Sequence, residues 1–232
     1  MTKETAKHCL LYVGDGGAAL VAATTYGLTV SGSTITLTDS ADGFVDDGIE
    51  VGDQLTVVGF ADNPSFTAIA MTVAIGSIVL KNPVNPDTRQ DVTLVTEAAG
   101  ESVTLTVEGF DELLGQATTN YSKSAAQIDF GDKNSGNFNP QGAGTVTMDV
   151  SVDGKVEFTE DGTHGGWTAL NDAVDAGTQP NCRLVLNSAR DSYYGPFSIS
   201  SQDGGGGKDD PNAYSFSLSV AARPVYVTGF GA

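Results

Sequence analysis

The chain has 232 residues, which is room for one large domain or two small ones. Its 29 acidic residues against 11 basic ones give a net charge of −18, which argues against nucleic-acid binding through phosphate contacts and against docking on anionic membranes. The apolar run at residues 9–13 is too short for a signal-peptide core, and no segment approaches the about 18 apolar residues of a membrane-spanning helix, so we expect a soluble intracellular product.

The first part of the chain predicts short β-strands. A polar tail at residues 1–7 precedes a short strand at residues 10–13, which ends at the turn signal of residues 14–17. Between residues 24 and 100, runs of Val, Thr, Leu and Ile alternate with Gly, Pro, Asn and Asp, as is typical of strands separated by turns. The predicted strands are residues 28–30, 34–38, 54–58, 69–73, 77–80 and 92–95. Their spacing indicates a small barrel or sandwich.

The middle of the chain predicts longer strands around a polar loop. Residues 103–107 alternate as a strand, and residues 117–124 form an extended polar run in which Tyr121 is the one large apolar side chain. The stretch 131–142 is too polar for a core and is predicted to be an exposed loop. Residues 146–152 then alternate apolar and polar, so their apolar side chains should share one face of a strand.

The last third of the chain predicts one helix among strands. Asp153 and Gly154 form a hairpin-turn signal, so residues 155–158 are expected to pair back. Residues 163–177 predict a helix that ends at Gly177. Its apolar stripe consists of Trp167, Leu170, Ala173 and Val174. The remaining predicted strands are residues 182–186, 196–200 and 213–221.

The residue types that could form a metal site do not stand at a suitable spacing. His8 and His164 lie far apart and outside any spacing that metal ligation uses. Residues 132–136 resemble the first half of a calcium loop, but Ala143 stands at the twelfth position, where Glu is required. An acidic cluster of Asp39, Asp42, Asp46, Asp47 and Glu50 is expected to be a solvated face rather than a weak calcium site. We therefore expect no metal.

Catalytic and cofactor sites are not predicted either. Gly207 and Lys208 follow a glycine run as in a phosphate loop, but the upstream glycine is missing and Asp209 replaces Ser or Thr. Cys9 and Cys182 are expected to be ordinary buried thiols, with a disulfide as the minority alternative. No Ser/His/Asp or Cys/His arrangement is present, so we expect neither an enzyme nor a cofactor.

Six segments carry a resemblance to a known family. They are LLYVGDGG (10–17), VEGFDELLGQATTNYSKSAAQIDFGDKNSG (107–136), the alternating strand 145–152, the helix that starts near Trp167 and ends in DAGT (175–178), GPFSISS (195–201) and AYSFSLSVA (213–221). In this order and spacing they resemble the major tail tube proteins of long-tailed, siphovirus-like bacteriophages and of gene-transfer agents. The intervening stretch, with DGFVDDGIEVGDQLTVVGF (42–60), looks like a small β module found in several phage structural proteins.

The resemblance implies a fold and a domain division. The fold is mainly β with one helix. Residues 1–20 and 101–232 would form a discontinuous tail-tube β-sandwich or half-barrel domain. Residues 21–100 would form an inserted small β-barrel or sandwich module on the outside of the tube.

The resemblance also implies a function. The chain would be a structural virion protein, made in the host cytoplasm, whose copies form stacked hexameric rings of the phage tail. The tube would carry DNA during ejection through an acidic lumen, without binding it specifically. Partners would be other copies and the tail initiator, tape-measure and terminator proteins, with no membrane, cofactor or metal.

Two sets of residues are singled out for assembly. Alternate residues of the polar extended run should face the lumen or a sheet edge: Thr118, Asn120, Ser122 and Ser124. The polar loop should reach a neighbouring ring through Asp132, Lys133, Asn134, Asn137, Phe138 and Asn139.

Two alternatives are weighed against a tube protein. A β-rich adhesin or carbohydrate-binding module should expose clustered aromatic residues, but aromatics make up only 8% of the chain and Tyr193–Tyr194 is the single adjacent pair. Within the structural class, a tail terminator, a decoration protein or the tube subunit of a contractile machine stays open.

Overall fold

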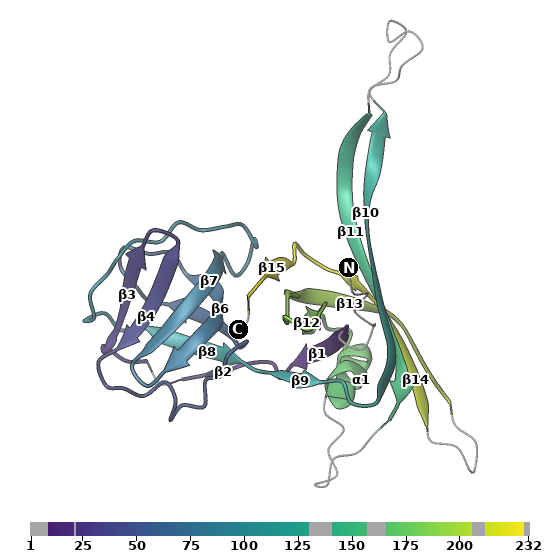
Figure 1. Ribbon diagram of the computed structural model, residues 1–232, viewed down its shortest axis with the longest axis horizontal. Helices are drawn as coiled ribbons and strands as arrows, with labels where there is room; N and C mark the ends of the chain where they lie inside the picture. Colours follow the sequence, from purple (N-terminus) through teal and green to yellow (C-terminus); the bar gives the residue numbers. More distant parts are fainter. Residues whose placement is uncertain (1–8, 21, 130–140, 157–165, 206–211, 230–232) are drawn as a thin grey trace, which may run out of the picture.

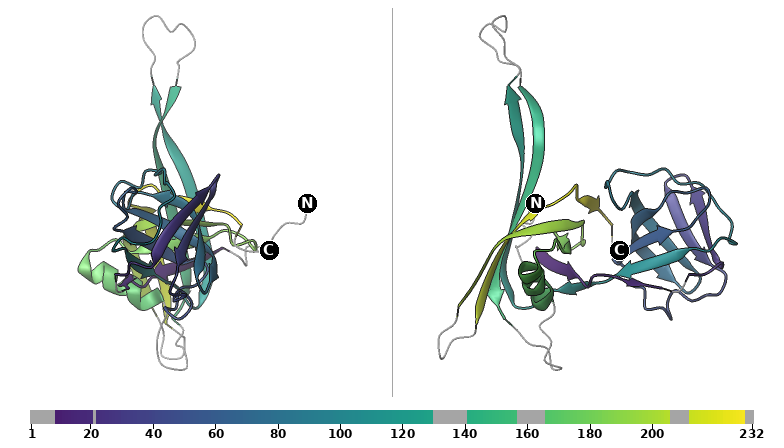
Figure 2. Two further views of the ribbon diagram at one scale, coloured as in Figure 1. Left: turned by 90° about the vertical axis from the view of Figure 1, so that its left-hand side faces the viewer. Right: turned by 180° about the vertical axis from the view of Figure 1, so that it is seen from behind.

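The computed structural model describes residues 9–20, 22–129, 141–156, 166–205 and 212–229. Within these residues the chain forms two antiparallel sheets and one helix, arranged as two units side by side, with a long hairpin projecting from one of them (Figure 1 and Figure 2). The predicted mainly β fold with one helix is confirmed. No helix in the described part of the chain has the length and apolar character needed to cross a membrane.

The first unit, called the module here, spans residues 18–108 and has a seven-stranded sheet in the order β2–β8–β5–β6–β7–β4–β3. The strands are β2 (Ala18–Ala19), β3 (Tyr26–Ser31), β4 (Thr34–Asp39), β5 (Gln54–Val58), β6 (Phe66–Ala74), β7 (Ser77–Val84) and β8 (Thr104–Glu108). Their inward side chains pack into one core that includes Leu28, Phe44, Leu55 and Phe66. Strand β8, which the sequence analysis assigned to the second unit, pairs with β5 and β2 in this sheet.

The module is not a closed barrel. Among the described residues its end strands, β2 and β3, do not pair with each other, and a single bridge between Leu28 and Glu97 covers the far side of β3. Residues 92–95 were predicted to be a strand, but the side chain of Asn63 takes the place of a neighbouring strand there. Its Oδ1 accepts the Val95 N–H at 2.7 Å, and its Nδ2 donates to the Val95 carbonyl at 3.1 Å.

The second unit, called the hairpin unit here, comprises the described residues 9–17 and 109–229. Its sheet has the order β10–β11–β14–β13–β12–β1–β9, and β15 also pairs with β13. The strands are β1 (Leu10–Gly14), β9 (Phe110–Glu112), β10 (Gln116–Asp129), β11 (Gln141–Lys155), β12 (Asn181–Val185), β13 (Ser192–Gly205), β14 (Ala213–Val220) and β15 (Val225–Val227). The first part of β13 pairs with β12 and β15 and its second part with β14. Strand β13 therefore joins two halves of the sheet, which share one core that includes Leu11, Val150, Leu184, Phe197 and Phe216.

The predicted helix is confirmed as α1 (Gly166–Ala176), which contacts β1, β9 and β13. Leu170 and Ala173 of its apolar stripe are buried. Gly177 follows with a φ of +66°, the left-handed conformation that commonly ends a helix.

The predicted hairpin turn at Asp153 and Gly154 is wrong, because β11 runs straight through both residues. Gly154 pairs with Gln116 on one side and with Tyr214 on the other. A side chain at this position would clash with the carbonyl oxygen of Gly115 and the hydroxyl of Tyr214. The glycine therefore permits a close approach inside the sheet rather than a turn.

The chain enters and leaves the module at one place. The N–H of Asp15 donates to the carbonyl of Gly109 at 3.1 Å, so the segments that lead into β2 and out of β8 lie side by side. The C-terminal strand β15 also lies between the two units (Figure 1).

Candidate assembly surfaces

One face of the four neighbouring strands β10, β11, β14 and the second part of β13 is polar. Three rows of paired residues cross the strands on this face: Thr118–Asp153–Ser215–Asp203, Asn120–Ser151–Ser217–Ser201 and Ser122–Asp149–Ser219–Ser198. The other face carries core residues such as Val150, Val152, Phe216 and Leu218. Because side chains alternate across a strand, the alternation of Ser with apolar residues separates this polar face from the core.

The predicted lumen residues Thr118, Asn120, Ser122 and Ser124 all lie exposed on the polar face. The Ser124 hydroxyl lies 2.9 Å from that of Thr147 on the neighbouring strand. Their position at the lumen stays a prediction. The predicted ring-stacking residues Asp132, Lys133, Asn134, Asn137, Phe138 and Asn139 lie outside the described residues.

The charge of the polar face is negative. Its three rows contain Asp149, Asp153 and Asp203 and no Lys or Arg. The hydroxyl of Ser219 donates to Oδ1 of Asp149 at 2.5 Å, which holds that carboxylate against the sheet. Lys155 lies on β11 beyond the rows, opposite Ala213.

The four strands end in two free edges. Strand β10 pairs only with β11 among the described strands. Among the described strands, the stretch 198–205 of β13 likewise pairs only with β14, because β12 and β15 pair with β13 no further than residue 196. Each edge therefore presents backbone N–H and C=O groups that another strand can pair with.

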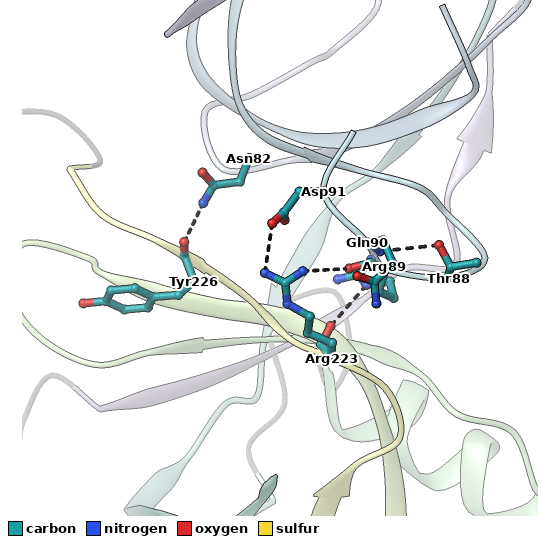
Figure 3. Close-up of polar contacts among 7 residues, drawn as sticks. All are labelled: Asn82, Thr88, Arg89, Gln90, Asp91, Arg223 and Tyr226. Atoms are coloured by element: carbon teal, nitrogen blue, oxygen red, sulfur yellow. Dashed lines mark hydrogen bonds and ion pairs between the residues drawn. The ribbon is translucent and has the colours of Figure 1, made fainter. Parts of the chain in front are cut away.

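Buried arginines hold the module against the hairpin unit. Arg89 is 5% exposed, and it donates to the carbonyl of Tyr194 at 3.1 Å. It also donates to the carbonyl of Arg223 at 3.4 Å (Figure 3). Burial lowers the pKa of its guanidinium. Arg223 in turn forms an exposed ion pair with Asp91 at 3.2 Å. These contacts join the turn after β7 to the segment before β15.

A second buried arginine lies at the centre of the contact between the module and the hairpin unit, which is called the seam here. Arg183 is 4% exposed, and its guanidinium lies 5.6 Å from the ring centroid of Tyr12 and 5.4 Å from that of Tyr194. The Tyr194 hydroxyl donates to the carbonyl of Gly52 in the module at 3.1 Å. Gly52 has a φ of +102°, and any side chain there would meet the Arg183 guanidinium, so this turn requires glycine.

Carboxylates also lie in the seam. Glu108 Oε2 accepts the Asn181 amide at 2.7 Å and the Gln54 amide at 2.9 Å, and so bridges the two units. Burial raises the pKa of Glu108 in spite of these hydrogen bonds. Burial likewise raises the pKa of Asp53. The C-terminal segment accepts two hydrogen bonds from the module. Lys81 donates to the Thr228 carbonyl at 2.7 Å. Asn82 donates to the Tyr226 carbonyl at 2.5 Å (Figure 3).

One member of the acidic cluster, Asp39, stabilises a turn of the module, and the others are exposed. Asp39 accepts the N–H groups of Ala41 at 2.9 Å and Gly43 at 3.1 Å. The other members, Asp42, Asp46, Asp47 and Glu50, are exposed, as expected for a solvated face. Within the described part of the chain, no three His, Cys, Asp or Glu side chains are grouped so as to hold a metal ion.

The remaining sequence candidates are thiols or lie outside the described residues. Cys9 and Cys182 are free thiols, the first partly and the second fully buried, and burial raises the pKa of both. His8, His164 and residues 207–209 fall outside the described part of the chain.

The seam is not predicted by the sequence patterns. Arg89 and Arg183 are 94 positions apart and follow no shared pattern. One local signal was present, because Arg183 interrupts the otherwise apolar strand of residues 182–186. A charged side chain in such a strand normally has buried partners.

Comparisons with known proteins give one family. The model of a family described as "Phage tail tube protein" matches residues 90–226, more than half of the chain. Among solved structures, a chain from the tail of an empty GTA particle with C6 symmetry is 20% identical, with a TM-score of 0.44, over 51% of this chain and 87% of that one. A chain from the virion of a native gene transfer agent particle is 19% identical, with a TM-score of 0.44, over 51% and 89%. No curated protein matches the chain.

Proposed function

Since the chain belongs to the phage tail tube protein family, a family of structural virion proteins rather than enzymes, we propose that its copies close into hexameric rings that stack into a tube. The observation that carries this proposal is the pair of free edges on opposite sides of the four neighbouring strands β10, β11, β14 and the second part of β13. Exposed edges are an aggregation hazard in a monomer, and closure of a ring removes them.

The strand directions support pairing between β10 of one copy and residues 198–205 of the next. The four strands alternate in direction, so β10 beside the end of β13 continues the antiparallel order. Six copies would give a barrel of roughly 24 strands with a backbone diameter of about 50 Å at the usual strand spacing and tilt. Such a barrel has room for a DNA duplex.

The polar face is proposed to line the lumen. Hydroxyl and amide groups keep that wall wet, and Asp149, Asp153 and Asp203 supply negative charge without Lys or Arg in the same rows. Like charges within a Debye length of about 8 Å repel, so DNA phosphates would slide past this wall without binding. The module lies on the opposite side of the sheet and would project outward from the tube (Figure 1).

Residues 131–142 are proposed to contact the next ring, because the described ends of β10 and β11 that flank this stretch project far beyond the rest of the unit (Figure 2). The tail initiator, terminator and tape-measure proteins are the expected further partners of such a tube. None of these contacts involves a cofactor.

Electron microscopy of the purified chain at high concentration, alone or with a tail initiator, tests the proposal. We expect hollow tubes built of six-fold rings. A variant in which a two-residue turn replaces residues 131–142 should fold and form rings but fail to elongate. A wild-type chain that stays monomeric under all conditions would overturn the assembly, and normal tubes from the deletion would overturn the role of the loop.

We further propose that the module is an inserted domain that folds by itself. Residues 21–100 formed the expected insertion, and the pairing of β2 and β8 within the module favours wider limits at Ala18 and Glu108. The adjacent entry and exit at Asp15 and Gly109 support this division, because excision leaves a short gap.

Excision of residues 18–108, with Gly17 joined to Gly109 through a short Gly-Ser linker, tests the division. The excision uncovers Tyr194 and Val227, which are fully buried in the complete chain, so both should be replaced by Ser in the same variant. A folded product that still assembles is expected. A product without a cooperative unfolding transition would show that the module belongs to the core.

A further inference from the structure

The outer face of the projecting hairpin stays apolar beyond the end of the subunit's own core. The outer face is the face of β10 and β11 opposite to the polar face. Val146 continues the alternation of Met148 and Val150, yet Val146 is 51% exposed whereas Met148 is 1% exposed. Tyr121, paired with Val150 on the same face, is 45% exposed. A strand that alternates in this way normally packs its apolar side against protein, so a single copy leaves this side uncovered.

An open groove of about 950 Å³ runs along this face, between the hairpin and the module. Its lining includes Lys123, Val146, Tyr193, Arg223 and Tyr226. The Lys123 ammonium lies 5.4 Å from the centroid of the Tyr193 ring. Asp91 also lines the groove and forms an ion pair with Arg223. The apolar walls therefore carry one net positive charge, from Lys123, in a chain whose net charge is −18. A second copy of the chain is complementary to it in charge.

Helix α1 is the element of a second copy that is placed to reach this face. Gln202 of β13 donates to Asn171 of α1 at 2.9 Å, so α1 lies over the core side of β13 beside its free edge. When β10 of one copy pairs with that edge, its outer face comes under the neighbour's α1. The helix exposes Val174, at 38%, together with Asp172 and Asp175.

We propose that α1 of one copy packs on the outer face of the hairpin of the next copy in the ring. Val174 contacts Tyr121, the rest of the exposed side of α1 lies toward Val146, and the aspartates of α1 face Lys123. This contact rests on the proposed ring assembly. The contact attaches each subunit to its neighbour at a second place besides the paired strand edges. Two separate contacts fix the angle between neighbouring copies. Edge pairing alone also permits open ribbons, whereas a fixed angle closes a ring.

A matched pair of substitutions on one strand tests the contact in the full-length chain. Val146→Asp charges the outer face, and Thr147→Asp makes the same change one residue on, at an exposed position of the polar face. Circular dichroism should show that both variants fold. Val146→Asp should raise the protein concentration needed for tubes by about tenfold or more, since it removes a buried apolar contact, while Thr147→Asp should leave it near the wild-type value.

Cysteine cross-linking locates the partner of this face. In a Cys9→Ser background, Tyr121→Cys combined with Val174→Cys should give a ladder of disulfide-linked species from oxidised tubes. Ser122→Cys combined with Val174→Cys, whose side chain at position 122 lies on the polar face, should give monomers. If the wild type forms tubes, but the Tyr121→Cys/Val174→Cys variant gives no ladder and Val146→Asp assembles as the wild type does, this contact alone is overturned. A wild-type chain that forms no rings would overturn the ring and the contact together.

Discussion

The module and the hairpin unit differ in how far their strands extend beyond their own cores. In the module, strands of two to nine residues surround one core. In the hairpin unit, β10 and β11 are 14 and 15 residues long, and their far ends lie beyond the core and outside contact with the module (Figure 1). The strands of the module therefore pack around the module's own core, whereas the hairpin unit leaves strand edges and a strand face uncovered for contacts with other copies.

The seam and the polar face also differ in their charged residues. Four of the described basic side chains, Lys81, Arg89, Arg183 and Arg223, lie at the seam between the units. The polar face keeps aspartates without basic neighbours in its rows. Basic side chains, with the carboxylates of Glu108, Asp53 and Asp91 near them, thus lie between the two units, whereas the rows of the surface proposed to face DNA carry negative charge alone.

Equal losses of core volume should have unequal consequences for assembly. Phe66 and Phe216 are both fully buried, the first in the module and the second in the hairpin unit. Phe66→Ala and Phe216→Ala should each lower the free energy of unfolding by about 3–5 kcal/mol in urea titrations. Because Phe216 supports the proposed barrel strands, only Phe216→Ala should also prevent tube formation by electron microscopy. Equal assembly defects would show that the module takes part in the ring.

The seam should couple the two units, and Arg89 should carry more of that coupling than Arg223. Arg89→Ala removes a buried hydrogen bond from a charged donor to the Tyr194 carbonyl and should cost about 2 kcal/mol. Arg223→Ala removes an ion pair whose side chains are 53% and 75% exposed, and it should cost less than about 1 kcal/mol. Thermal unfolding of the monomer should split into two transitions in Arg89→Ala but not in Arg223→Ala. A single transition in both variants would show that the apolar part of the seam suffices.

Local patterns predicted much of the fold. The predicted strand at residues 54–58 coincides with β5, and the helix differs from α1 by three residues at its start and one at its end. Both depend on alternation or on a helical stripe next to glycine, which a sequence displays directly. The alternation of residues 146–152 likewise placed the core side and the polar side of β11 correctly.

The errors arose where a residue acts through a distant partner. Asp153 and Gly154 are typical of a hairpin turn, but Gly154 lies within a strand. Its lack of a side chain leaves room for the Gly115 carbonyl oxygen and the Tyr214 hydroxyl. Residues 92–95 have the composition of a strand, but the side chain of Asn63 replaces the partner strand. The assembly surfaces were partly predictable, because an exposed polar strand is visible in sequence, whereas the free edges follow from strand order.

The seam should also make stability depend on pH through Glu108. Its pKa is raised in the folded chain, so the stability it contributes is complete below its ordinary pKa of 4.5 and is lost as the pH rises through the folded value. Urea titrations should therefore show the wild type losing stability relative to Glu108→Gln as the pH rises above 4.5. Glu101→Gln makes the same change at an exposed position outside the seam and is the control. A flat difference for Glu108→Gln would place the Glu108 carboxylate in contact with water.

Neutralising the polar face should barely affect folding and should act on DNA alone. The triple change Asp149→Asn, Asp153→Asn and Asp203→Asn keeps the size of each side chain, and it should alter the free energy of unfolding by no more than about 0.5 kcal/mol per site. Tubes of this variant should retain a short DNA duplex at low salt, where screening is weak, and wild-type tubes should not.

The control for that experiment is the same loss of charge on the module, through Asp46→Asn, Asp47→Asn and Asp62→Asn, all at exposed positions. If the aspartates of the polar face act from inside a lumen, this control should behave as wild type, because the module lies across the sheet from the polar face. Equal DNA retention by both triple variants would mean that the total charge of −18, and not its position, keeps DNA away. The difference between the two surfaces would then lie in strand length and edges alone.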